Sequence, residues 1–326
     1  MAFFTKISYT FQITIILNKY NKMEKRKIER VERIMFKKHL ATIIYILLLF
    51  TIYLLLDTFV TSSVYQVVEK SNEEINYSTD NVVNITDNSY EDENIKIELS
   101  QYNVFNTNVY VADIVLSSPE YLKTAFAKGI YGKNITDKTS NIAESVNAIL
   151  AINGDYYGVQ EKGYVLKDSV IYRDISAGNK EDLLIYSDGR FEIINEADAD
   201  LETLVLSGAS NILSFGPALI KDGNINVSES FEVARAMSSN PRTAIGIIDE
   251  LHYVFVVSDG RTNESEGMSL YELAEFLKAL NVEIGYNLDG GGSSTMYFNG
   301  KIINNPTTSG KRISERSVSD IVYIGY

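Results

Sequence analysis

The sequence predicts an α+β domain with a mixed sheet and at least one βαβ unit, preceded by a single N-terminal transmembrane helix. Three observations support this prediction. Short strand-like runs separated by Gly, Asp and Asn dominate the chain beyond residue 94. A well-marked amphipathic helix lies between two such runs at 253–288. One apolar stretch, 40–60, has the ~20 residues that a helix needs to cross a bilayer.

The N-terminal part is predicted to be a membrane anchor. Residues 1–39 hold ten Lys or Arg residues and three Glu residues, and the stretch 40–60 has Asp57 as its only charge. Because basic residues flank the cytoplasmic end of membrane helices, we expect a basic cytoplasmic segment at 1–39, a signal-anchor at 40–60 and an extracytoplasmic remainder at the cell membrane. A cleaved signal peptide is the alternative, although the apolar run is long for one and no small-residue cleavage site follows it.

Two further segments complete the predicted organisation. Residues 61–94 are rich in Ser, Asn, Thr, Asp and Glu without a sustained period, so we expect a polar stalk. Residues 95–326 form the predicted folded domain.

Composition excludes several classes of function. Outside 1–39 the chain has 20 basic and 40 acidic residues, a formal charge of −20, so we expect no nucleic-acid binding. No Cys and only two His are present, which excludes thiolate chemistry and Cys- or His-rich metal sites. No cofactor is certain, but oxygen ligands leave room for a divalent cation such as Ca²⁺ or Mg²⁺.

The segment 253–288 is predicted to be the βαβ unit. Ser269 and Glu272 have the spacing of a capping box, and leucines at 270, 273, 277 and 280 form an apolar stripe. Strand-like runs lie on both sides of this helix. If the two strands are parallel neighbours, both end at the same edge of the sheet, where ligands bind in such folds.

Three aspartates follow strand-like runs and are candidate catalytic residues. Asp259 follows the first strand of the unit and Asp289 follows the second, while Asp155 ends a third run that we expect at the same edge. Neighbouring strands lie ~4.8 Å apart, so such carboxylates would be roughly 5 to 10 Å from one another. This range covers both carboxylate pairings used in glycoside hydrolysis, so retention and inversion both stay open.

Glycines and arginines near these aspartates suggest an anion site. Gly290, Gly291 and Gly292 can expose successive backbone N–H groups, and Arg242 and Arg261 can bind phosphate oxygens. Each feature alone has a plainer interpretation as a turn, a flexible loop or a surface cation. Their joint occurrence behind a βαβ pattern favours a site for a substrate that is part sugar and part phosphate.

Residues 95–326 resemble the phosphodiester glycosidase family, whose members include the enzyme that removes N-acetylglucosamine to uncover mannose 6-phosphate and bacterial exopolysaccharide-associated proteins. The matching blocks are Asn153 to Tyr157, Phe215 to Leu219, Pro241 to Gly246, Asp259 to Arg261, Asn287 to Ser294 and a closing block at Arg316 to Tyr323. The cysteine-rich additions of the animal enzyme are missing, so its substrate need not carry over.

The resemblance implies hydrolysis of a sugar-1-phosphodiester, such as an N-acetylglucosamine-1-phosphodiester, in cell-surface polysaccharide or teichoic-acid-type material. Asp289 and Asp259 would face the anomeric carbon, and Asp155 would be a third carboxylate or a cation ligand. The substrate-binding residues implied are Asn153, Gly154, Arg242, Thr243, Arg261, Asn287, Gly290, Gly291, Gly292, Ser293 and Ser294.

The alternative is a non-catalytic envelope protein that binds exopolysaccharide or assists its assembly. The strongly acidic domain also conflicts with a polyanionic substrate, because it repels one at long range. A local basic pocket or bound cations would have to overcome this repulsion.

Overall fold

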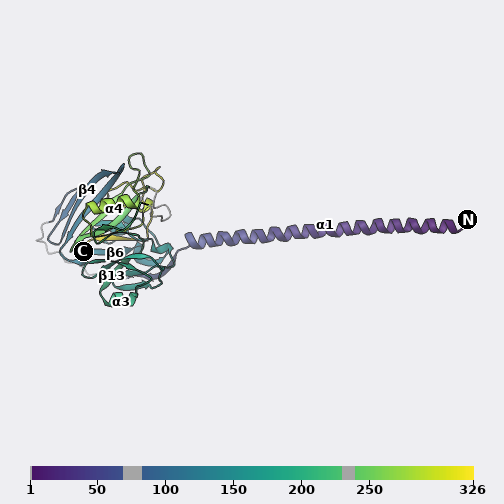
Figure 1. The fold of residues 1–326 in the computed structure, drawn as a ribbon, viewed down its shortest axis with the longest axis horizontal. Coiled ribbons are helices and arrows are strands. Elements are labelled where there is room, and N and C mark those ends of the chain that lie inside the picture. Colours follow the sequence, from purple (N-terminus) through teal and green to yellow (C-terminus); the bar gives the residue numbers. More distant parts are fainter. Residues whose placement is uncertain (1, 69–82, 230–238) are drawn as a thin grey trace. The chain divides into compact units, whose positions relative to one another are not determined.

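The computed structural model describes residues 2–68, 83–229 and 239–326, and the chain divides into two units, Met1–Thr61 and Ser62–Tyr326. The first unit is essentially one helix, α1 (Ala2–Phe59), drawn in purple in Figure 1. Between Lys19 and Thr58 it is long and apolar enough to cross a membrane, and it is the one described helix that meets this test of length and composition. Helix α1 contains residues 40–59 of the predicted anchor 40–60.

The second unit is mostly β-sheet. Its short helices are α2 (Thr139–Ser145), α3 (Leu201–Leu206) and α4 (Leu270–Ala279), with 3-10 turns η1 (Pro119–Tyr121), η2 (Ala127–Gly129), η3 (Tyr157–Val159) and η4 (Gly291–Ser293). Its strands up to residue 186 are β1 (Ser63–Val67), β2 (Asn84–Ile85), β3 (Ser89–Glu91), β4 (Ile95–Val104), β5 (Thr107–Leu116), β6 (Leu122–Phe126), β7 (Ile130–Lys133), β8 (Leu150–Asn153), β9 (Val165–Lys167), β10 (Val170–Arg173) and β11 (Glu181–Tyr186). The later strands are β12 (Phe191–Asn195), β13 (Ala209–Leu213), β14 (Ala218–Lys221), β15 (Asn224–Ile225), β16 (Arg242–Asp249), β17 (His252–Ser258), β18 (Ile284–Asn287), β19 (Met296–Phe298), β20 (Lys301–Ile302) and β21 (Asp320–Ile324).

The largest sheet has nine strands in the order β15-β14-β18-β16-β17-β5-β4-β3-β2. β16 lies between β17 and β18 and is antiparallel to both, so β17 and β18 run in the same direction without touching. The prediction of a mixed sheet with parallel neighbours joined by a helix is therefore wrong, since every described strand pair in this sheet is antiparallel. The predicted common edge survives, because two strands that share an antiparallel neighbour still end on the same side.

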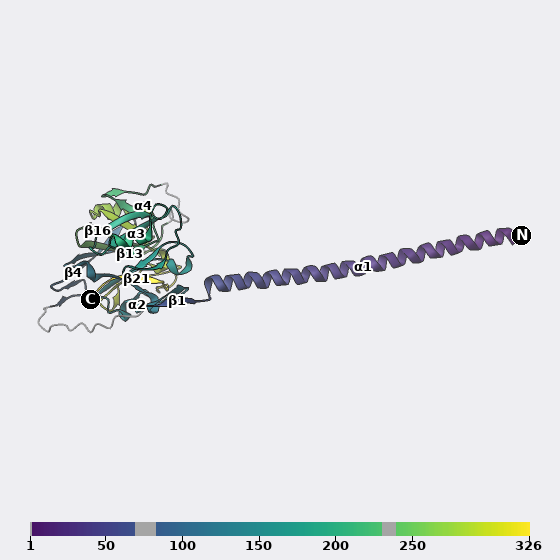
Figure 2. The same cartoon turned by 90° about the horizontal axis from the view of Figure 1, so that it is seen from below.

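A second sheet of five strands, in the order β20-β19-β8-β21-β6, packs against the first. One apolar cluster joins the facing sides of both sheets, with Ile114 and Phe255 from the larger sheet and Ile152 and Val322 from the smaller. Alternate residues of the larger sheet, such as Val254, pack with α4 on its other face. Together with α2 on the outer face of the smaller sheet, this gives layers of helix, sheet, sheet and helix, and Figure 2 shows α4 and α2 on opposite sides of the unit.

Helix α4 begins as its sequence predicts. The Ser269 hydroxyl accepts a hydrogen bond from the Glu272 amide at 3.2 Å, and the Glu272 carboxylate accepts one from the Ser269 amide at 2.7 Å. This reciprocal capping box satisfies two N–H groups that the first turn leaves unpaired. Leu273 and Leu277 are fully buried on the face of the helix that packs against the sheet. The cap and the apolar stripe thus fix where the loop after β17 ends.

The predicted polar stalk contributes strands at both of its ends. Residues 63–67 form β1, which pairs with β7, and residues 84–91 form β2 and β3 at the edge of the nine-stranded sheet. The middle of the predicted stalk, 69–82, lies outside the described residues. The predicted start of the folded domain at residue 95 therefore separates β2 and β3 from the sheet to which they belong.

Candidate functional site

Three strand termini meet at one edge of the nine-stranded sheet. Asp259 follows β17, Asp289 follows β18 by two residues, and Arg242 begins the strand between them. Arg242 is paired in register with Ser258, whose hydroxyl accepts a hydrogen bond from the Arg242 amide at 2.9 Å. Because β17 and β18 are two strand spacings apart, the chain positions before the two aspartates are separated by ~10 Å.

The third predicted aspartate belongs to the other sheet, but the end of its strand meets the same edge. The Asn153 side chain donates a hydrogen bond to the Asp289 carbonyl at 2.6 Å and accepts one from the Thr243 hydroxyl at 2.8 Å. The Asp289 amide donates to the Gly154 carbonyl at 3.3 Å. Asn153 and Thr243 are buried. We conclude that Asn153, Gly154 and Thr243 join the two sheets directly behind Asp289.

Among the three aspartates, Asp289 forms an ion pair with an arginine, Arg316, whose side chain is partly exposed to solvent. Its carboxylate is 2.7 Å from an Arg316 guanidinium nitrogen and accepts a hydrogen bond from the Ser293 hydroxyl at 2.7 Å. Burial raises the pKa of Asp289, and the positive charge of Arg316 and these hydrogen bonds oppose that rise. The Arg316 side chain is 40% exposed, whereas that of Asp289 is 11% exposed.

Arg316 is a residue that the sequence interpretation did not assign to the site. Besides Asp289, its guanidinium donates to the Ser293 hydroxyl at 2.8 Å and to the Gly290 carbonyl at 3.1 Å. The sequence signal was its place at the start of the closing block, but nothing local predicts that this block returns to the glycine run.

The glycine run is required by close approach of its neighbours. Gly291 has φ +65°, and a Cβ there would lie 2.9 Å from a guanidinium nitrogen of Arg261. The expected nest of three amides is not found, because the Gly291 amide donates to the Pro241 carbonyl at 2.8 Å and the Gly290 amide is hydrogen bonded to the Asp289 carboxylate. Gly291 instead allows the Arg261 side chain to approach the backbone, and Gly290 and Gly292 allow the Pro241 carbonyl and Thr308 to do so.

Arg242 and Arg261 give this edge its positive charge. Burial lowers the pKa of Arg242 to about 10, and the nearby charge of Arg261 adds to this effect, so Arg242 stays charged at neutral pH. Arg242 donates through Nε to the Met268 carbonyl at 2.9 Å, and Arg261 donates to the Asn240 side chain at 3.0 Å and the Thr308 carbonyl at 2.5 Å. Two fixed guanidinium groups within electrostatic range of each other are suited to an anion.

Asp259 is held by neutral donors. Its carboxylate accepts hydrogen bonds from the Tyr110 hydroxyl at 3.2 Å, the Asn305 amide at 2.8 Å, and the side chains of Asn304 and Asn305 at 3.3 and 3.1 Å. Burial and the charge of Asp259 raise the pKa of Tyr110 to about 12. With four donors and 3% exposure, Asp259 fixes the loop after β20 rather than presenting free oxygens.

Asp155 lies in a buried acidic region. It accepts hydrogen bonds from the Ser214 and Tyr156 amides, both at 2.5 Å, and its own amide donates to Asp320 at 2.7 Å. Burial raises the pKa of Asp320 to about 6, which the charge of Lys167 at 2.8 Å opposes. Across the described residues, no three His, Asp or Glu side chains are grouped so as to hold a metal ion.

Asn287 and Ser294 are buried at the same edge. The Asn287 side chain donates to the Gly216 carbonyl at 2.8 Å, and its oxygen has no hydrogen-bond partner among the described residues. The Ser294 hydroxyl is likewise unsatisfied within the described part of the chain. These two predicted substrate-binding residues thus keep unused hydrogen-bonding capacity among the described residues.

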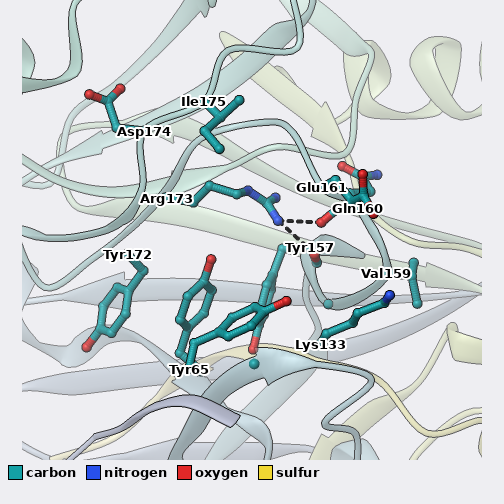
Figure 3. Close-up of a pocket in the computed structure, with 13 residues that line it drawn as sticks. Tyr65, Lys133, Tyr157, Val159, Gln160, Glu161, Tyr172, Arg173, Asp174 and Ile175 are labelled. Atoms are coloured by element: carbon teal, nitrogen blue, oxygen red, sulfur yellow. Dashed lines mark hydrogen bonds between the residues drawn. The ribbon is translucent and has the colours of Figure 1, made fainter. Parts of the chain in front are cut away.

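A hollow of about 490 Å³ lies away from these residues. Figure 3 shows its tyrosines, among them Tyr65, Tyr157 and Tyr172, grouped below Arg173. Arg173 donates to the Tyr157 and Gln160 carbonyls at 3.1 and 2.6 Å, drawn as dashed lines in Figure 3. None of the predicted site residues lines this hollow. Arg173 thus holds the chain segment that follows Asp155.

Fold and site together define a sandwich-like domain with arginines at one sheet edge, beside a glycine run and a buried carboxylate. Residues 146–325 match the family model for phosphodiester glycosidases, and the chain belongs to this family. The family resemblance found in the sequence is therefore confirmed. Members of this family are glycosidases that act on N-acetylglucosamine-1-phosphodiesters.

Known relatives cover parts of the chain. An uncharacterized SPbeta prophage-derived protein, YomE, of Bacillus subtilis (strain 168) is 28% identical over 201 residues, which are 60% of this chain and 31% of that protein. N-acetylglucosamine-1-phosphodiester alpha-N-acetylglucosaminidase of Mus musculus is 36% identical over 103 residues, 27% of this chain and 19% of that protein. The chain therefore spans less than a third of the length of either relative.

A solved structure shares the fold. The zebrafish N-acetylglucosamine-1-phosphodiester alpha-N-acetylglucosaminidase catalytic domain, auto-inhibited by its pro-peptide, aligns with a TM-score of 0.57 at 22% identity, covering 82% of this chain and 89% of that one. At this identity the likeness establishes the fold alone.

Proposed function

We propose that the chain hydrolyses the glycosidic bond of sugar-1-phosphodiesters, of the N-acetylglucosamine-1-phosphodiester type, in cell-surface polysaccharide or teichoic-acid-type material. Membership in the phosphodiester glycosidase family supports the reaction class. The observation that carries the proposal is the ion pair of Asp289 and Arg316. This pair lies beside the glycine run, against which the Arg261 guanidinium also packs. A carboxylate and fixed cations side by side suit a substrate with a sugar carbon bonded to a phosphate.

The arginines would bind the phosphate. A departing phosphomonoester has a second pKa near ~6, so it leaves with less protonation than a sugar hydroxyl needs. Catalysis would then depend mainly on preorganised positive charge where negative charge develops. Arg242 and Arg261 are already oriented by backbone and side-chain acceptors, so little reorganisation would accompany the reaction.

Asp289 would face the anomeric carbon, where it stabilises developing positive charge or attacks the carbon. Burial raises the pKa of this carboxyl group, and the positive charge of Arg316 favours its ionised form by opposing that rise. Asp259 and Asp155, saturated by neutral donors, would position the loops around it rather than touch the substrate.

The apolar part of α1 would anchor the enzyme in the cell membrane, with residues 1–39 in the cytoplasm and the second unit outside. The basic residues before the apolar stretch and the acidic chain after it support this orientation.

The test compares Asp289→Asn with a matched control in the full-length chain in detergent. Release of sugar from a chromogenic sugar-1-phosphodiester, with and without EDTA, should be lost in Asp289→Asn while the far-UV circular dichroism is unchanged. Asp249→Asn is the control, because Asp249 is exposed at the opposite end of the strand that Arg242 begins.

The outcomes separate the two candidate functions. Turnover retained in Asp289→Asn would remove this residue from the mechanism. Absence of turnover by the unaltered chain under any cation, together with measurable glycan binding, would favour the non-catalytic envelope protein instead.

A further inference from the structure

A second, smaller hollow of about 290 Å³ adjoins the candidate site through Arg261. Arg261, Lys311 and Arg312 provide positive charge in its lining, and Glu264 provides the one carboxylate. The rest of the chain beyond residue 39 has twice as many acidic as basic residues. A hollow with three cations and one carboxylate therefore has the opposite sign to the domain that holds it.

The two outer cations of this hollow are not used in holding the fold. Lys311 and Arg312 are both exposed, and within the described residues neither side chain has a carboxylate within ion-pair distance. Forty acidic residues would offer partners if the charges served only surface pairing. The positive charge of these side chains is therefore available to a ligand.

The loop that carries these cations is fixed by its own contacts. The Thr307 hydroxyl donates to the Arg312 carbonyl at 2.7 Å and accepts from the Gly310 amide at 3.0 Å. Arg261 ties the start of the loop by donating to the Thr308 carbonyl at 2.5 Å. A charged loop held in one conformation loses less side-chain and backbone entropy on binding than a free one.

The same loop connects two arginines of the candidate site. It begins at the contact with Arg261 and ends at Arg316, whose amide donates to the Gly292 carbonyl at 3.0 Å. Arg261 also lies against Gly291, so its guanidinium borders both the glycine run and the hollow. A phosphodiester at the glycine run, with its sugar toward Asp289, could direct its other substituent into the hollow.

We propose that this hollow is a subsite for a second phosphate, carried by the leaving group of the substrate. The inference rests on the function proposed above and narrows the substrate to anionic polymers in which sugar-1-phosphodiesters repeat. It also resolves the conflict between an acidic domain and a polyanion, because the field of exposed charges is screened beyond ~8 Å at physiological salt and a local basic site decides binding there.

The experiment uses the full-length chain in detergent and three substrates with the same sugar-1-phosphodiester. Their leaving groups are neutral, phosphate-bearing and carboxylate-bearing, and kcat/KM is measured for each at low and high salt. Because exposed charge pairs contribute modestly to binding, we expect a preference of roughly 3- to 10-fold for the phosphate-bearing over the neutral substrate. The preference should shrink as salt is raised.

The variant Lys311→Gln/Arg312→Gln should bring that ratio close to one. The control variant Lys128→Gln/Lys278→Gln also removes two exposed positive charges, but from positions outside the hollow, and should keep the ratio. A ratio near one in the unaltered chain, or a ratio unchanged in Lys311→Gln/Arg312→Gln, would overturn the subsite. An equal or greater preference for the carboxylate-bearing substrate would overturn its assignment to phosphate.

Failure of the proposed function gives a different result. If none of the three compounds is hydrolysed, the reaction is wrong, and the subsite is tested by calorimetric Kd values for the same compounds. A lower Kd for the phosphate-bearing compound that disappears in Lys311→Gln/Arg312→Gln supports the subsite. Equal Kd values for the phosphate-bearing and neutral compounds overturn it.

Discussion

Removal of Arg316 should destabilise the second unit in a way that depends on the charge of Asp289. In Arg316→Gln the Asp289 carboxylate loses its cationic partner at 2.7 Å and keeps the Ser293 hydroxyl. A hydrogen bond to a charged group contributes ~1.5–3 kcal/mol, and the 40% exposure of Arg316 favours the lower end, so we expect a loss of ~2 kcal/mol at pH 7.

The sign of the pH dependence follows from linkage. Burial raises the folded-state pKa of Asp289, so the folded protein holds this proton more tightly than the unfolded chain. The stability contributed by this group is present below the unfolded-state pKa and is lost as pH rises through the folded-state pKa. Without Arg316 this loss grows, so Arg316→Gln should be most destabilised near neutral pH and should approach the unaltered protein in acid.

A double-mutant cycle measured by urea unfolding tests this reasoning. The protein is the fragment from Ser62, which contains all five apolar clusters of the fold. Asp289→Asn removes the buried charge, so Asp289→Asn/Arg316→Gln should regain most of the stability that Arg316→Gln loses. A double variant as unstable as Arg316→Gln, or a loss below ~0.5 kcal/mol at pH 7, would refute the coupling, because unrelated surface changes fall within that range.

Two further changes test the glycine run and the core. Gly291→Ala places a Cβ at φ +65° and 2.9 Å from Arg261, and the backbone strain alone costs ~1–2 kcal/mol, so this variant should lower kcat/KM at least ~10-fold. The control Gly300→Ala, at φ +82° with no atom within 4 Å, should leave kcat/KM unchanged. Equal kcat/KM values for the two variants would contradict this expectation. Leu277→Ala leaves a cavity at a fully buried position of α4 and should lower the free energy of unfolding in urea by ~2–5 kcal/mol. The control Leu206→Ala changes a side chain that is 89% exposed and should lower it little. A decrease under ~1 kcal/mol for Leu277→Ala would show that α4 is not packed as described.

The sequence predicted local elements better than their partners. The capping residues of α4 and its buried leucines are set by contacts within one helix turn or one face, so their pattern is visible locally. The direction of neighbouring strands is a long-range property: nothing in the runs that became β17 and β18 shows that β16 lies between them. The predicted common edge is correct because β17 and β18 share the antiparallel neighbour β16, not because they are parallel neighbours.

The same distinction applies to the site. Asp289 and the glycines are adjacent in sequence and could be assigned together, but Arg316 lies 27 residues from the carboxylate that it contacts. Asp259 was predicted to face the sugar, yet its donors come from Asn304 and Asn305, about 45 residues away. Sequence reasoning identified which side chains gather, and the hydrogen-bond partners that distinguish their roles came only with the fold.

The three aspartates differ in what opposes their burial, and that difference supports the role proposed for Asp289 over one for Asp155 or Asp259. Asp259 has four neutral donors and Asp155 has two backbone amides, so both are satisfied without any ligand. Asp289 instead depends on a partly exposed arginine, and its pKa remains raised despite this partner. A carboxylate that the fold holds at a cost, next to cations that a phosphate would neutralise, is suited to interact with a substrate rather than to stabilise the protein.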